Sequence, residues 1–220
     1  MFKQILATAV ATCVSTSVFA GNMYIEGQLG MHNADVSTSS YSGTAAGITF
    51  TNVKADMDFD TATSMGIEFG ANMTDNVRLG YAFSTMNLDF SSATISGTAT
   101  DGSTTISGSG TINKSEFPSI GSTFDNKVKL FEAKVYYDFK GTGSTTPFIG
   151  AGIGFADIEN AEDMELALSI TAGANFDISD SVYFGVNASL TSIQGPTDEL
   201  GIGYEDISVT SGRLVVGKRF

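Results

Sequence analysis

The sequence offers few residues for catalysis or metal binding. It contains one cysteine, Cys13, and one histidine, His32. A zinc site needs several His or Cys ligands, and a Ser–His or Cys–His catalytic pair would have to use His32. Asp198 and Glu199 adjoin in the chain and do not by themselves form an acid–base pair across a substrate. The sequence therefore predicts no catalytic residue, no metal site and no cofactor, and the protein is expected not to be an enzyme.

Six charged residues stand out because they lie on the polar side of segments whose other side is apolar. Three are acids and three are bases: Glu26, Glu68, Glu132, Arg78, Lys134 and Arg213. Buried charges need partners, because each unpaired one is strongly unfavourable. The favoured interpretation is a balanced charge network that fills a barrel of about eight strands, whose interior is just wide enough for side chains. A narrow or gated conduit with these residues at its constriction remains the alternative.

The segments that would position these charges alternate between apolar and polar residues. About eight segments do so, each roughly 9–13 residues long, which suits a tilted strand that crosses a bilayer. In segment 131–139, for example, apolar residues alternate with Glu132, Lys134 and Asp138. An apolar outer face and a small, polar inner face are typical of transmembrane barrels, which must close to pair every strand edge. The predicted fold is all-β: an eight-stranded antiparallel transmembrane β-barrel with up-and-down meander topology.

The overall charge and hydropathy exclude other classes of protein. The chain has 24 acids against 11 bases, a net charge of -13, so it has no excess of cations to bind nucleic acid. No apolar run of about 18 residues occurs beyond the N-terminus, which excludes helical membrane spans.

The N-terminus has the pattern of an export signal. Lys3 precedes an apolar stretch that ends in Val18-Phe19-Ala20, with small residues where a signal peptidase cleaves. We expect residues 1–20 to be a signal peptide cleaved after Ala20, and residues 21–220 to form the barrel in the outer membrane of a Gram-negative cell.

The connections between segments alternate between short and long. The predicted short turns are 74–76, 140–146 and 179–181, whereas 32–60 and 90–126 are long loops, as on the outside of outer-membrane barrels. The tract Ser91–Thr111 is mostly Ser, Thr and Gly, which predicts a mobile, exposed loop. Its functional alternative is a contact segment for a host or cell surface, and its alternating hydroxyl residues are also compatible with a hairpin that extends the barrel.

Several motifs resemble the small outer-membrane β-barrel family of Gram-negative bacteria. They are Val135-Tyr136-Tyr137-Asp138-Phe139, Thr146-Pro147-Phe148-Ile149-Gly150-Ala151-Gly152-Ile153-Gly154, Asp75-Asn76-Val77-Arg78-Leu79-Gly80-Tyr81 and the terminal Arg219-Phe220. This family includes the OmpA-like transmembrane domain and the opacity and surface-antigen proteins. The resemblance implies that the barrel-assembly machinery reads Phe220 as its signal, although Lys218 stands where an apolar residue is usual. We expect no peptidoglycan-binding domain after the barrel, and therefore not the anchoring role of full-length OmpA proteins.

The resemblance is specific for architecture and says little about activity. The expected function is a surface protein with a structural, integrity or adhesion-type role; the alternative is a narrow porin-like channel for small or hydrophobic solutes. Expected partners are outer-membrane lipid, lipopolysaccharide, the barrel-assembly machinery, and a host or cell-surface ligand bound through loops 32–60 and 90–126. Two further expectations concern side-chain placement. The glycines Gly150, Gly152 and Gly154 would leave room for the ends of Arg78 or Arg213, and an aromatic girdle would comprise Tyr137, Phe139, Phe176, Phe184 and Phe220.

Overall fold

The computed structural model describes residues 22–116, 125–139, 143–159, 161, 163–197 and 203–220. The predicted signal peptide and its cleavage site lie outside the described residues. In this part of the chain, no helix is both long and apolar enough to cross a membrane.

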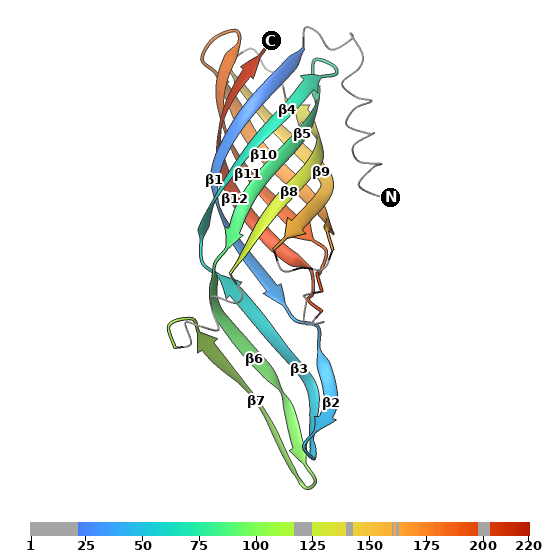
Figure 1. Cartoon of the computed structure of the whole chain (residues 1–220). Helices are drawn as coiled ribbons and strands as arrows, with labels where there is room; N and C mark the ends of the chain where they lie inside the picture. The colour runs from blue at the N-terminus through green and yellow to red at the C-terminus, as the bar shows by residue number, and fades with distance from the viewer. Residues whose placement is uncertain (1–21, 117–124, 140–142, 160, 162, 198–202) are drawn as a thin grey trace.

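Eight strands close into a barrel (Figure 1). They are β1 (Met23–Ser37), β4 (Ala62–Asn72), β5 (Val77–Leu88), β8 (Asn126–Asp138), β9 (Thr145–Ile158), β10 (Glu165–Asp177), β11 (Val182–Ile193) and β12 (Ile207–Arg219). Each pairs antiparallel with the barrel strand that precedes it in the chain, and β12 pairs with β1 from Tyr24–Arg219 to Asp35–Ser208. The predicted eight-stranded antiparallel meander is therefore confirmed.

The alternation in the sequence separates the two faces of the barrel wall. Apolar side chains point outward and remain exposed around the circumference, among them Leu29, Met65, Ile170, Leu214 and Val216. A closed sheet with an apolar exterior leaves no backbone group unpaired in lipid, which is the requirement for crossing a membrane with strands.

The two ends of the barrel differ. The short turns between β4 and β5 and between β10 and β11 lie at one end, together with the start of β1 and the end of β12; we call this the turn end. Aromatic rings gather on its outer wall, where Phe176 stacks on Phe184 at 4.7 Å and Tyr137 meets Phe139 at 5.1 Å. Phe220 is 65% exposed beside Lys218, whose ammonium lies over its ring. The structure thus places the residues of the predicted aromatic girdle near this end.

The opposite end carries a sheet that the sequence analysis assigned to loops. Four strands form it, and we call it the blade: β2 (Tyr41–Ala45), β3 (Ile48–Phe59), β6 (Phe90–Asp101) and β7 (Thr104–Asn113). They pair antiparallel in the order β2-β3-β6-β7. The end of β1 also pairs antiparallel with β3, from Asp35–Asp58 to Ser37–Asp56. Figure 1 shows the blade extending away from the rim of the barrel opposite the turn end, and we call this end of the barrel the blade end. The prediction of long loops at 32–60 and 90–126 was wrong for most of their described residues, because pairing between these two distant segments orders both as strands, in the second as far as Asn113.

The two faces of the blade have different chemistry. Cross-strand hydroxyl pairs cover one face, with oxygen–oxygen distances of 3.0 Å for Thr94–Thr111, 2.9 Å for Thr98–Ser107 and 3.1 Å for Thr100–Thr105. Such pairs stabilise neighbouring strands. The interpretation of the hydroxyl-rich tract Ser91–Thr111 as a hairpin is therefore confirmed. The other face carries apolar residues: Ile48, Phe50, Val53, Ala55, Met57, Ala93, Ile95, Ala99, Ile106 and Ile112.

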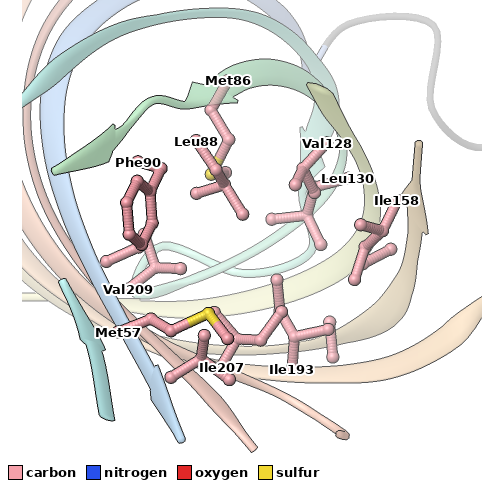
Figure 2. Close-up of a cluster of buried hydrophobic side chains, with 14 residues drawn as sticks. Met57, Met86, Leu88, Phe90, Val128, Leu130, Ile158, Ile193, Ile207 and Val209 are labelled. Atoms are coloured by element: carbon pink, nitrogen blue, oxygen red, sulfur yellow. The ribbon is translucent and has the colours of Figure 1, made fainter. Parts of the chain in front are cut away.

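The lumen near the blade end is filled by an apolar core, shown in Figure 2. Met86, Leu88, Val128 and Leu130 point inward from β5 and β8, and side chains of β1, β6, β9, β10, β11 and β12 also belong to the cluster. Met57 of the blade packs into the same cluster, so the apolar face of the blade continues the inside of the barrel. The expectation of a polar core throughout the lumen is thus corrected, because the lumen is polar in its middle and toward the turn end but apolar toward the blade end.

Candidate functional site

All six predicted lumen charges lie inside the barrel. Glu26, Glu68, Arg78, Glu132, Lys134 and Arg213 are each at most 6% exposed, because their strand positions share the inward parity. They do not form one network. Among the described residues they divide into three groups: a cluster around Arg78 and Glu68, a separate ion pair, and an arginine without an ion pair.

Arg78 is the centre of the largest cluster. Its Nε lies 2.9 Å from Asp138 Oδ2, and its Nη1 lies 3.3 Å from Glu26 Oε1. The guanidinium also lies over the rings of Tyr136 at 4.6 Å and Phe148 at 5.1 Å. Asp138 was noted among the inward residues of its strand but was not assigned to the site. Its parity with Glu132, Lys134 and Tyr136 is the signal that would have included it.

Glu68 is fully buried and is held by hydroxyl and amide donors. Tyr24 Oη donates to its Oε1 at 2.7 Å, and Tyr136 Oη donates to its Oε2 at 2.8 Å. Gln28 Nε2 bridges this carboxylate to that of Glu26, at 3.4 and 3.3 Å. Tyr183 Oη donates to Glu26 at 2.6 Å. Tyrosines therefore solvate the carboxylates in place of water, which the sequence analysis missed.

Glu132 and Lys134 form the separate pair. The ammonium of Lys134 lies 3.0 Å from Glu132 Oε2, and Ser169 Oγ donates to the other carboxylate oxygen. The glycine row of β9 makes room for these groups: a Cβ at Gly150 would overlap the ring of Tyr136, and one at Gly152 would meet Ser169 and Glu132. The expectation that these glycines accommodate Arg78 or Arg213 was wrong, because the atoms nearest to a Cβ added at any of the three belong to β8 and to Ser169 of β10.

Arg213 is the lumen charge that the network leaves out. It is 6% exposed, and within the described residues it has no ion pair or side-chain hydrogen bond. Asn187, its cross-strand neighbour, and Ser64 each hold a buried oxygen without a hydrogen-bond partner among the described groups. The middle of the lumen is thus polar but incompletely satisfied.

A cavity of about 310 Å³ opens at the turn end. Its lining includes Arg78 and Asp138, whose ion pair forms part of its inner boundary, and Asn72 and Asn175. Arg219, paired with Asp177 at 2.6 Å, lines its mouth. The cavity therefore leads from the turn end to the charge cluster.

His32 lies inside the barrel and not in a surface loop as the sequence analysis expected. It is 3% exposed on β1, and its Nε2 lies 2.8 Å from the carbonyl oxygen of Asn87. This contact makes Nε2 the donor, and Nδ1 has no hydrogen-bond partner among the described residues. Among the described residues, neither a serine hydroxyl nor a carboxylate hydrogen-bonds to the ring. The same residues contain no group of three His, Cys, Asp or Glu side chains able to hold a metal ion.

The base of the blade is tied to the connection between β11 and β12. Lys54 Nζ lies 3.0 Å from Glu205 Oε2 and 3.7 Å from Asp56 Oδ1. The hydrogen bond to Glu205 raises the pKa of Lys54 above its ordinary value. Backbone bonds add Ser39 N to Gly203 O at 3.0 Å and Glu205 N to Ser37 O at 2.7 Å. These contacts fix the direction in which the blade leaves the barrel.

Comparison with known proteins identifies the architecture. Neither a protein-family model nor a curated protein sequence matches the chain. Among solved structures, Neisserial surface protein A (NspA) matches with a TM-score of 0.56 and 13% identity, over 90% of this chain and 97% of that chain. The fold is that of small outer-membrane β-barrels. The outer membrane protein AlkL, solved in lipid bilayers, matches with a TM-score of 0.53 and 11% identity, over 94% of each chain.

The structural neighbours confirm the fold to which the sequence motifs pointed. Their identities are low, so the likeness concerns the fold and leaves the activity to be argued from this chain's own residues. The apolar exterior of the barrel, with its ring of aromatic side chains, is the physical basis for a location in the outer membrane.

Proposed function

We propose that the chain is an outer-membrane surface protein of adhesion type, in which the barrel anchors the blade outside the cell. The observation that carries this proposal is the blade itself. It is an ordered four-stranded sheet beyond the barrel rim, with a hydroxyl-covered face and apolar residues such as Ile106 and Tyr41 more than half exposed. Large exposed apolar side chains on a rigid element favour a contact surface over a passive loop.

The contents of the lumen support an anchoring role. The charge cluster around Arg78 fills the part toward the turn end, and the apolar core fills the part toward the blade end. Side chains from all sides of the barrel thus pack across its interior. A barrel filled in this way acts as a rigid support.

The partners proposed for this role follow from position. Outer-membrane lipid and lipopolysaccharide surround the wall, and a host or cell-surface ligand would meet segments 32–60 and 90–126, of which residues 117–124 lie outside the described residues. Phe220, whose N–H donates to the carbonyl of Met23 at 2.9 Å where β12 meets β1, is the proposed signal for the barrel-assembly machinery.

Trimming the blade tests the proposal. Residues 95–110 are replaced by a Gly-Gly turn, which joins Thr94 to its cross-strand partner Thr111 and leaves the barrel intact. We expect cells that display this variant to lose adhesion to the surfaces that wild-type cells bind, while the trimmed barrel still folds and shows heat-modifiable migration on a gel. Unchanged adhesion by the trimmed variant contradicts an adhesive role for the blade. The matched control is Thr51→Lys, a single change on the blade that keeps all four strands.

The alternative is a narrow channel, and a specific observation favours it. The cavity at the turn end and the unsatisfied polar groups near Arg213 leave part of the lumen incompletely packed. For the refolded protein in a planar bilayer we expect no steady single-channel conductance, because the apolar core blocks the path toward the blade end. Reproducible openings would favour the channel, and Leu130→Gly, which removes a buried side chain from the core, would then increase the conductance.

A further inference from the structure

The outer edge of β7 is unpaired in the structure. Within the described residues, β7 pairs with β6 alone, through ten consecutive residue pairs from Asp101–Thr104 to Ser92–Asn113. All its residues except Ile112 are exposed. A strand at the edge of a sheet presents a row of free N–H and C=O groups, which are available to another strand.

This edge lacks the features with which proteins usually protect such strands. The segment Thr104–Asn113 contains no charged residue and no proline, and its pairing with β6 has no bulge. Lys, Pro and bulges are the common means of preventing edge-to-edge pairing. The opposite edge of the blade is different, because β2 has five residues and a register shift between Tyr41 and Gly43. The edge of β7 is thus suited to accept a partner strand.

The sequence of β7 shows which strand fits. It reads nearly the same in both directions from Ser109: Gly108 matches Gly110, Ser107 matches Thr111, and Ile106 matches Ile112. An antiparallel copy centred on Ser109 therefore places isoleucine opposite isoleucine on the apolar face and hydroxyl opposite hydroxyl on the other face. In this pairing every residue lies opposite a residue of the same parity. Alternate residues of a strand point their N–H and C=O groups to the same edge, so the free groups of the two copies lie opposite each other.

We propose that the β7 edge binds the β7 edge of a second copy of this chain, antiparallel and centred on Ser109. The contact is isologous, since each copy contributes the same strand. The two blades then form one continuous sheet. The net charge of -13 would otherwise keep copies apart, but the strand that meets its copy is uncharged.

The geometry of the blade places the second copy in a facing membrane. β7 runs from the tip of the blade back toward the barrel (Figure 1). In the antiparallel pair, the partner's strand runs the opposite way, so its barrel lies beyond the tip of this chain's blade. The two barrels are then at opposite ends of the joined sheet. This inference rests on the proposed surface role, and it names the partner: the same protein on a neighbouring cell.

Charge substitutions at the centre of the pair test the inference in two differently labelled populations of cells that display the full chain. Ser109→Lys places two ammonium groups opposite each other, and Ser109→Asp places two carboxylates there. When both labelled populations carry the same charge variant, we expect about tenfold fewer clusters that contain both labels than for wild type. The loss is large because many weak contacts act together between two cells. Mixing Ser109→Lys cells with Ser109→Asp cells should restore clustering. The control Thr51→Lys, on the exposed face of β3 away from the edge, should cluster as wild type does.

Cross-linking provides a direct readout. Directly opposite residues of an antiparallel pair lie about 4.5–5.5 Å apart at Cα, within disulfide range. With oxidant, Ser109→Cys should give a dimer that contains both epitope tags when the two populations carry different tags, whereas Thr51→Cys should not. Clustering of Ser109→Lys cells at the wild-type level, or no restoration in the mixed population, would overturn the inference.

The outcome separates this inference from the proposed function. If wild-type cells adhere to other surfaces through the blade but do not cluster with one another, self-pairing is overturned and the adhesive role stands. If trimming residues 95–110 leaves all adhesion unchanged, the adhesive role itself fails.

Discussion

Arg78→Ala is expected to lower the free energy of unfolding by about 3–5 kcal/mol, which is typical of removing one partner from a buried ion pair. The guanidinium contacts Asp138 and Glu26, and it is almost completely buried. Its removal leaves two carboxylates close together without a cation, next to the buried Glu68. Tyrosine and glutamine donors remain, but they do not neutralise the charge.

Urea titration of the protein refolded in lipid vesicles, followed by tyrosine fluorescence, measures this change. Arg213→Ala is the matched control, because it removes an arginine of similar burial that has no ion pair among the described residues. We expect this control to change stability far less. Equal losses for the two variants would mean that burial alone, and not the contacts with Asp138 and Glu26, gives Arg78 its importance.

Ile170→Arg is expected to destabilise the barrel by about 2–4 kcal/mol, the magnitude for a cation near the middle of the bilayer on a barrel's outer face. Ile170 is 60% exposed on β10, between Ala151 and Leu190 of the adjacent strands. The change leaves the lumen untouched, so its effect comes from the surrounding lipid.

Folded yield in vesicles and urea titration measure the effect. Ile106→Arg is the control: Ile106 is 69% exposed on the blade, beyond the barrel wall, and the same substitution there should be nearly neutral. An unaffected Ile170→Arg variant would show that this part of the wall does not face lipid.

The sequence by itself determined the barrel wall, because the period of two is a local property. Leu168, Ile170 and Ala172 must share one face of a strand, and Ser169 and Thr171 must share the other, whatever the strand pairs with. The same reasoning placed all six lumen charges inside. The same alternation places Val128 and Leu130 of the apolar core inside, because they have the parity of Glu132. A pattern within one strand does not show, however, where the lumen changes from polar to apolar.

Only the tertiary structure decided which groups meet. Arg78 on β5 reaches Glu26 on β1 across the intervening β4, so this contact depends on the curvature and register of the closed barrel. The blade arises in the same way: β3 and β6 come from segments separated by two barrel strands, and their pairing orders hydroxyl-rich chain that has little to bury alone. Local pattern fixes the face on which a side chain lies, whereas long-range pairing fixes its neighbours, and the charge cluster and the blade both depend on neighbours.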